Sequence, residues 1–314
     1  MQGSVPPPST NLPFRVTALL AAVSAWALVA VGGVVRITES GLGCPDWPLC
    51  DGNVVPAGGT ASAIEFSHRA TAAFVTSFVV ATAVWAWWRY RSRRDVVVPA
   101  TVAALLIPGQ ALLGAVVVWL ELPGWIVGFH FVVGMLFLAA TIVTAVAAWP
   151  RRSWAPSRGF GKLVWSSAGA GLLLVSAGAA VVSAHADEAC GKEWPACNGT
   201  FVAGGGDAAI QVVHRSLAYV VAGLAVALAV LAWRGKGPRL LGSLPLVAVL
   251  AQMALGISLV VAGEGSSAHE PLAILHVAGA GTVWAFLVLL AARNGPLRRE
   301  RAPATRLGAP VTAR

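Results

Sequence analysis

Charged residues are scarce in this chain of 314 residues. They make up 11% of it, while hydrophobic residues make up 57%, and an ordinary soluble domain contains about 25% charged residues. This shortage excludes a soluble globular enzyme. The formal net charge of +9 does not indicate a nucleic-acid binder either, because so apolar a chain can collect its basic residues in the cytoplasmic loops of a membrane protein.

Eight apolar runs alternate with short connections that contain most of the charged residues. The runs lie at about 14–35, 64–88, 96–120, 125–149, 163–184, 210–233, 240–262 and 271–292. Each run exceeds the roughly 20 residues that a transmembrane helix needs. Because a helix satisfies its backbone hydrogen bonds internally, long non-alternating runs can cross lipid only as helices. The sequence therefore predicts an all-α integral membrane protein with eight transmembrane helices.

The basic residues gather on one side of this predicted membrane protein. Of the 22 Lys and Arg residues, 17 follow the second, fourth, sixth and eighth runs, and Arg15 precedes the first. The other side has 11 of the 13 acidic residues but only four basic ones, namely Arg36, Arg69, Lys192 and Arg215. Cytoplasmic loops carry the excess of Lys and Arg, so both termini are predicted to be cytoplasmic.

The first apolar run is predicted to be a retained helix. Ala25-Trp26-Ala27 resembles the cleavage site of a signal peptide, but the run continues to Val35 and only one basic residue precedes it. The N-terminal tail is rich in proline and lacks the Arg-rich amphipathic pattern of a transit peptide. We therefore expect a multi-pass protein of a bacterial-type plasma membrane.

Cysteine is rare, and the predicted cytoplasmic side has none. All four cysteines lie in two outward loops, where an oxidising compartment allows disulfides: Cys44, Cys50, Cys190 and Cys197. We expect two structural bridges that hold the loops over the helices. A redox-active pair stays open as an alternative, since a small closed loop can be strained and strained disulfides are the labile ones.

The chain contains an internal repeat. The segment CPDWPLCDG at 44–52 is echoed by CGKEWPACNG at 190–199. Histidines of the first half recur at an offset of 146, His68 as His214 and His130 as His276. A repeat with an even number of spans keeps its orientation, so we predict two tandem four-helix bundles in the same orientation. The predicted divisions are a cytoplasmic N-terminal tail at 1–13, an N-terminal bundle at 14–150, a linker at 151–162, a C-terminal bundle at 163–292 and a basic cytoplasmic tail at 293–314.

These four histidines are candidate haem ligands. In each half the second and fourth helices run inward, and each bears one histidine about five residues, or roughly 7 to 9 Å, from its outer end. Two histidines at one level on such helices can bind both axial positions of a haem iron. The alternative is a packed, hydrogen-bonded intramembrane histidine, which is harder to sustain for four at equal depth.

Other metal chemistry is disfavoured. A zinc site would need a third carboxylate or thiolate, and none stands at a repeated position within the helices. No Cys-x-x-Cys-His motif is present, which excludes covalent c-type haem. The two remaining histidines, His185 and His269, lie in outward loops without counterparts, and we expect them to be solvated.

Three arginines lie on the outward side near these histidines. Arg69 and Arg215 directly follow His68 and His214, and Arg36 ends the first apolar run. A guanidinium at the outer interface can bind a haem propionate bidentately. Snorkelling to lipid headgroups is the alternative. Because these arginines breach the positive-inside pattern, we favour the propionates.

The two halves differ at one acidic residue. Glu65 precedes His68 by three residues, whereas Gln211 holds the matching place before His214. Residues three apart share a helix face, so Glu65 is expected in the same low-dielectric site as His68, where a carboxylate can do acid-base work. A carboxylate that stabilises the helix start or pairs with Arg69 is the alternative. We expect Glu65 to be catalytic, and the second half to hold a permanent cofactor.

At these residues the chain resembles the haem A synthase family, whose members convert haem O to haem A for cytochrome oxidase. Glu39 departs from the family's pattern, which has a small residue there, usually glycine; this concerns the loop and not the ligands. The duplicated eight-helix bundle of that family agrees with the repeat. The matching segments span nearly the whole chain: GGVVRIT at 32–38, SGL at 40–42, CPDWPLC at 44–50, Glu65 with His68 and Arg69, His130, His214 with Arg215, and His276.

The resemblance implies an oxidoreductase that converts a methyl group of haem O to a formyl group by two successive water-derived hydroxylations. By the same likeness, His68 and His130 would hold the substrate haem O. The second pair, His214 and His276, would hold a haem b cofactor, and Glu65 would be the catalytic carboxylate. Implied partners are haem O synthase, cytochrome oxidase assembly factors and membrane lipid, with no nucleic acid. The electron acceptor and the oligomeric state are left open.

Two other classes remain as alternatives. A two-haem b-type cytochrome that only relays electrons would need the same histidines, but no acid in one half alone. A transporter with inverted repeats would line its path with polar residues, and the same-orientation repeat disfavours it. The sequence therefore predicts a haem A synthase, with the electron relay as the runner-up.

Overall fold

The computed structural model describes residues 9–150, 157–202 and 204–294. Residues 1–8, 151–156 and 295–314 lie outside the described part of the chain, and with them most of the three predicted cytoplasmic segments. Within the described part, the long elements are all helices, and eight of them are long and apolar enough to cross a membrane. The prediction of an all-α membrane protein with eight transmembrane helices is confirmed.

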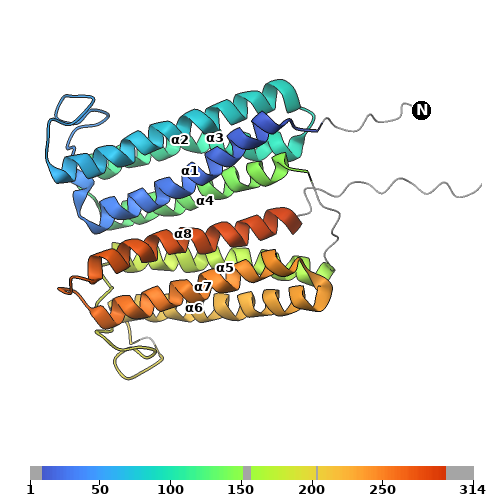
Figure 1. The fold of residues 1–314 in the computed structure, drawn as a ribbon. Coiled ribbons are helices and arrows are strands. Elements are labelled where there is room, and N and C mark those ends of the chain that lie inside the picture. The colour runs from blue at the N-terminus through green and yellow to red at the C-terminus, as the bar shows by residue number, and fades with distance from the viewer. Residues whose placement is uncertain (1–8, 151–156, 203, 295–314) are drawn as a thin grey trace, which may run out of the picture.

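The eight helices are joined by short connections and by two longer loops that contain the cysteines (Figure 1). Their ends differ from the predicted runs by no more than five residues. A short 3-10 turn at Ser40–Leu42 and a π turn at Ala232–Lys236 follow α1 and α6. The helices are α1 Leu12–Ile37, α2 Thr60–Tyr90, α3 Arg94–Trp119, α4 Gly124–Ala148, α5 Arg158–Ser183, α6 Gly206–Leu231, α7 Arg239–Ala262 and α8 His269–Asn294.

Matching side-chain caps begin the first helix of each half. The side chain of Asn11 accepts a hydrogen bond of 3.1 Å from the N–H of Phe14, and the Ser157 hydroxyl accepts one of 3.3 Å from the N–H of Phe160. Such oxygens satisfy N–H groups that the first turn of a helix leaves unpaired. Both caps and both fully buried phenylalanines are separated by the same 146 residues as the histidines. The repeat therefore extends to the helix starts.

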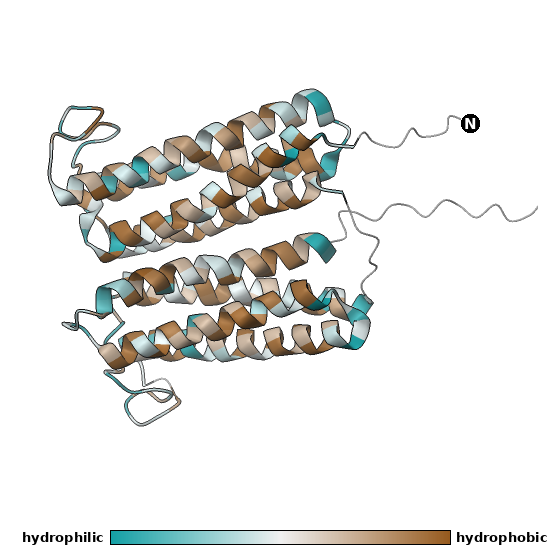
Figure 2. Cartoon of the chain, in the orientation of Figure 1, coloured by the Kyte–Doolittle hydropathy of each residue, from teal (hydrophilic) through white to brown (hydrophobic). Residues whose placement is uncertain are grey.

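The helices pack in two groups of four (Figure 1). In the N-terminal group, α1 to α4 pack against one another in chain order and α4 returns to α1; α5 to α8 form the C-terminal group in the same way. The groups meet where α8 packs against α1 and α4, and where α4 packs against α5. Hydrophobic residues cover the lengths of the helices and polar residues their ends, as a lipid environment requires (Figure 2).

Close packing joins the two groups. Gly33 of α1 lies so near Val277 of α8 that an added Cβ would be 2.7 Å from the valine Cγ1, which is typical of the small residues that let membrane helices approach. The indole N–H of Trp284 donates a hydrogen bond of 2.8 Å to the carbonyl of Met135, and that of Trp26 donates one of 3.1 Å to the Thr282 hydroxyl. Direct contacts and hydrogen bonds therefore connect the groups.

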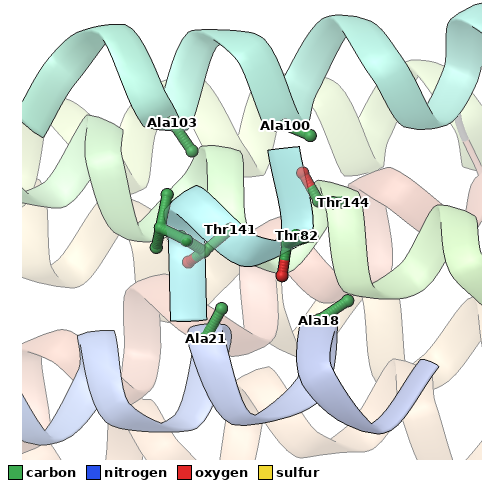
Figure 3. A pocket seen from close by; sticks show the side chains of 8 residues that line it. Ala18, Ala21, Thr82, Ala100, Ala103, Thr141 and Thr144 are labelled. Atoms are coloured by element: carbon green, nitrogen blue, oxygen red, sulfur yellow. The ribbon is translucent and has the colours of Figure 1, made fainter. Parts of the chain in front are cut away.

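The N-terminal group leaves a narrow cavity between its helices, far from the outward loops. Its volume of about 10 Å³ is that of one water-sized group. Each lining threonine donates its hydroxyl to a carbonyl of its own helix, at 2.7 to 2.8 Å, so little polar character remains for the cavity. The lining residues, which surround it in Figure 3, are Ala18, Ala21, Val79, Thr82, Ala100, Ala103, Thr141 and Thr144.

Candidate functional site

The four candidate ligands lie on α2, α4, α6 and α8, in the second or third turn of each helix. Each imidazole packs against a glycine of the preceding helix. A Cβ added to that glycine would meet the histidine Cε1 at 3.2, 3.7, 3.0 and 3.0 Å, respectively. The pairs are Gly32 with His68, Gly114 with His130, Gly178 with His214, and Gly256 with His276.

Sequence reasoning missed these glycines, although they recur. Gly32 and Gly178 are 146 residues apart, like the histidines, and Gly114 and Gly256 are 142 apart. The shorter offset applies to α3 and α7, because Gly256 follows His214 by 42 residues whereas Gly114 follows His68 by 46. At Gly32, Gly178 and Gly256 an added Cβ would press against the imidazole, whereas at Gly114 it would make an ordinary contact. The repeat thus preserves both the histidine and the space that its ring occupies.

A second recurring contact holds the histidine-bearing helices. The side-chain amide of Gln110 donates a hydrogen bond of 3.0 Å to the backbone carbonyl of His130. Gln252, 142 residues later, donates one of 2.7 Å to the carbonyl of His276. An amide between apolar helices is costly unless it is hydrogen-bonded, so these bonds connect α3 to α4 and α7 to α8 at the level of the histidines.

The imidazoles have the properties of unpaired ligands. Each Nδ1 is buried and has no hydrogen-bond partner, while each histidine as a whole keeps partial exposure. A buried polar atom without a partner typically costs about 1 to 3 kcal/mol, which binding at the ring's other nitrogen can offset. Two imidazoles in each group are the donor set of a b-type haem. Among the described residues, no group of three or more His, Cys, Asp and Glu side chains could hold a metal ion.

Glu65 is buried, 4% exposed, and both of its carboxylate oxygens are bonded. Oε2 accepts a hydrogen bond of 2.7 Å from the backbone N–H of Cys44, and Oε1 forms an ion pair with Arg69. At the matching place, the amide of Gln211 donates a hydrogen bond of 2.9 Å to the carbonyl of Asp187. One group therefore has a buried carboxylate beside its histidine, and the other a neutral amide that binds its loop.

Arg69 binds both Glu65 and the first cysteine-containing loop. Its guanidinium donates hydrogen bonds of 2.6 to 2.9 Å to three loop carbonyls, those of Cys44, Asp46 and Leu49. The ion pair between Arg69 and Glu65, predicted as the alternative to a catalytic Glu65, is thus present in the structure. Arg69 also holds the loop. Sequence reasoning missed the loop carbonyls because nothing local to Arg69 specifies how a loop about 20 residues away folds.

Arg215 holds the second cysteine-containing loop with fewer bonds. Its Nη1 donates to the carbonyls of Glu193 and Ala196, at 2.9 and 2.7 Å, while its buried Nη2 has no partner. Arg36, at the end of α1, donates a hydrogen bond of 3.4 Å to the carbonyl of Val182 at the end of α5. It therefore lies where the two groups meet.

With this geometry in view, we compared the chain with known proteins. Residues 15–63 and 59–288 match the family described as cytochrome oxidase assembly protein. The chain belongs to the cytochrome oxidase assembly protein family. The matched residues include Glu65, the three arginines and all four candidate ligands.

Relatives within this family share most of the chain's length. A haem A synthase of Shouchella clausii is 29% identical over 279 residues, which cover 84% of this chain and 92% of that protein. A haem A synthase of Halalkalibacterium halodurans is 27% identical over 297 residues, which cover 89% of this chain and 97% of that protein. These matches confirm the resemblance to the haem A synthase family that the motifs indicate.

The two cysteine-containing loops of this family member are closed by disulfides, as predicted. In the first loop, the Asp46 carboxylate accepts hydrogen bonds from the N–H groups of Asp51 and Gly52, at 2.6 and 2.8 Å. In the second, the Glu193 carboxylate accepts one of 2.8 Å from Gly199. The Gly52 N–H lowers the pKa of the Asp46 carboxyl, which favours its ionised form. The bridges are Cys44–Cys50 and Cys190–Cys197.

The two other histidines lie away from the paired imidazoles. His185 is exposed and follows α5, and His269 is partly exposed and begins α8. Neither packs against a glycine in the way that the four candidate ligands do.

Proposed function

We propose that the protein is a haem A synthase, which oxidises a methyl group of haem O to a formyl group in two successive steps. Water supplies the oxygen, and the first product is an alcohol. The observation that carries this proposal is the buried carboxylate of Glu65, three residues before His68, where the second half has Gln211. Pure electron transfer between two haems requires no such acid in one half.

In this proposal the N-terminal group binds the substrate. His68 and His130 hold haem O, which places it beside Glu65 because His68 and Glu65 share a face of α2. The Cys44 N–H and Arg69 hold the carboxylate in one orientation. From there it can take a proton from an attacking water or stabilise positive charge that develops at the methyl carbon. A glutamine could do neither.

The C-terminal group keeps the cofactor. His214 and His276 are suited to hold haem b, because their rings lie against glycines and their Nδ1 atoms lack partners. When bound, haem b supplies a one-electron redox centre. The unpaired Nη2 of Arg215 has hydrogen-bonding capacity left for a propionate, and we assign the same role to Arg36 and to the remaining capacity of Arg69.

We also propose a location, a topology and partners for the enzyme. By the distribution of basic residues, the protein lies in the plasma membrane with both termini in the cytoplasm and the disulfide loops outside. Haem O synthase and cytochrome oxidase assembly factors are the proposed partners. We regard the two disulfides as structural links that keep each loop over its group of helices.

The substitution Glu65→Gln tests the catalytic role directly. The variant should keep both haems bound but form no haem A, because the amide cannot accept a proton. Pigments extracted from the purified protein, made in cells that supply haem O, would be separated into haem B, haem O and haem A. Full haem A formation by the variant would remove the carboxylate from the mechanism.

A matched control for Glu65→Gln is Glu188→Gln, which removes an exposed acid from the second outward loop. It should leave haem A formation unchanged.

The same extraction also tests the runner-up function. Haem B alone in the wild-type protein, despite a supply of haem O, would favour an electron relay over a haem A synthase.

A further inference from the structure

A groove lies between α4 and α5, where the N-terminal and C-terminal groups meet. Its volume of about 460 Å³ falls within the range of small-molecule sites. Trp125 and Phe129 of α4 line it and are 75% and 55% exposed. Because these residues lie in a membrane-spanning helix, their exposed faces meet lipid. The groove is therefore open to a ligand that travels in the bilayer.

The groove lies at the level of both histidine pairs. Phe129 directly precedes His130 on α4, and the groove-lining Ala179 directly follows Gly178, against which His214 packs. Residues adjacent in a helix point about 100° apart. The groove is thus separated from each pair by little more than one helix, which is about 10 Å across.

Two hydroxyl groups give the groove polar character. Ser183 of α5 lies so close to α4 that a Cβ on Gly128 would be 2.5 Å from its Oγ, and in the described part of the chain this Oγ has no hydrogen-bond partner. Ser176 donates to the Leu172 carbonyl at 2.8 Å and can still accept. Two aromatic rings and two hydroxyls suit a flat ring with polar oxygens, whereas a lipid acyl chain would use none of these polar groups.

At the equivalent boundary in the repeat, other residues hold the places of these two rings and two hydroxyls. There, between α8 and α1, Gly33 packs against Val277 and Trp26 is hydrogen-bonded to Thr282. The general fold therefore does not require the polar and aromatic lining. At an offset of 146, the places of Trp125, Phe129, Ser176 and Ser183 are held by Pro271, Leu275, Ala30 and Ile37.

We propose that this groove binds the ring of a lipid-soluble quinone, which accepts the electrons released by the oxidation. The inference rests on the proposed function, which requires an oxidant. Conversion of a methyl group and one water to a hydroxymethyl group releases two protons and two electrons. A quinone that takes up two electrons and two protons becomes a quinol, so the step balances. Oxidation of the alcohol to the formyl group releases the same numbers and reduces a second quinone.

Binding can be measured without turnover. The purified protein, in quinone-free phosphatidylcholine nanodiscs, would be titrated with decylubiquinone and the bound fraction determined after separation. The test variant combines Phe129→Leu with Ser183→Ile, which introduces the residues of the repeat. Loss of one stacked ring and one hydrogen bond should weaken saturable binding by about tenfold.

A matched control combines Phe74→Leu with Ser77→Ile on α2. Phe74 is 58% exposed and Ser77 is also exposed, so this variant makes the same chemical changes on another surface of a spanning helix. It should bind decylubiquinone like the wild type. Equal, non-saturable uptake by all three proteins would show that quinone only partitions into the lipid, and would overturn the proposal.

A second measurement separates this inference from the proposed function. Haem A would be measured in anaerobic nanodiscs that contain haem O, with decylubiquinone as the sole oxidant. The Phe129→Leu, Ser183→Ile variant should form haem A more slowly than the Phe74→Leu, Ser77→Ile control at limiting quinone. Equal rates would overturn the quinone site but leave the synthase intact. Saturable quinone binding by a wild-type protein that never forms haem A would instead overturn the synthase.

Discussion

The N-terminal and C-terminal groups of helices share their histidines and loop-binding arginines, yet differ beside the first histidine of each group. In the first group, Glu65 links Arg69 to the Cys44 N–H. In the second, Gln211 binds only the loop, and one nitrogen of Arg215 has no partner. A few substitutions at equivalent places have thus changed the charge of one site while its helices and ligands stayed the same.

The two cores also differ at the end remote from the cysteine-containing loops. The cavity of the N-terminal group is bordered mainly by alanines and threonines, whereas four of the eight equivalent places in the C-terminal group hold large aliphatic side chains that are at most 1% exposed. These are Val164, Leu228, Leu287 and Leu290, in place of Ala18, Thr82, Thr141 and Thr144. Looser packing suits a group that admits and releases a substrate, and tighter packing suits one that retains a cofactor, in line with the proposed division.

The largest expected effect concerns the cofactor pair. His276→Ala should abolish the b-type absorbance of the purified protein, because a bis-histidine haem loses one of its axial ligands. His130→Ala should leave this absorbance in place, since it alters only the substrate site. Reduced-minus-oxidised spectra, normalised to protein, would show the difference, with the exposed His185→Ala as control. A full b-type spectrum in His276→Ala would contradict the assignment of the cofactor to the C-terminal group.

The arginines provide the next comparison. Arg69→Ala should lower the free energy of unfolding by about 3 to 5 kcal/mol, because it leaves the buried Glu65 carboxylate without its partner. Arg215→Ala should cost less, about 1 to 3 kcal/mol, since only hydrogen bonds to loop carbonyls are lost. Denaturant unfolding in detergent would measure both. The double variant Glu65→Gln with Arg69→Ala should recover part of the loss, and equal losses in the two single variants would refute the difference.

The core substitutions provide the third comparison. Leu287→Ala should destabilise the protein by about 2 to 5 kcal/mol, because it opens a cavity in a filled core. Thr141→Leu, at the equivalent place in the N-terminal group, should change stability by less than about 1.5 kcal/mol if the added atoms use the existing space. Thermal unfolding followed by circular dichroism would compare them. A loss for Thr141→Leu as large as that for Leu287→Ala would mean that the N-terminal core has no spare room.

The sequence itself determined the helices and the local placement of residues on them. Lipid offers no hydrogen bonds to a backbone, so apolar runs of sufficient length had to be helices, and eight of them are present. Local spacing placed Glu65 and His68 on one helix face, and the repeat paired each histidine with its counterpart. These features depend on residues within a few turns of one another, or on a direct comparison of the two halves.

The tertiary structure alone decided which side chains and backbone atoms meet between different helices and loops. Arg69 binds three loop carbonyls, each histidine ring packs against a glycine of the preceding helix, and two glutamines hold the backbone of His130 and His276. The groove between α4 and α5 depends on how the two groups meet, and its lining comes from both. Such contacts depend on the rotation of each helix about its axis and on the path of each loop. Hydrophobicity determines neither the rotation of a helix nor the path of a loop, because any apolar face of a helix can contact lipid.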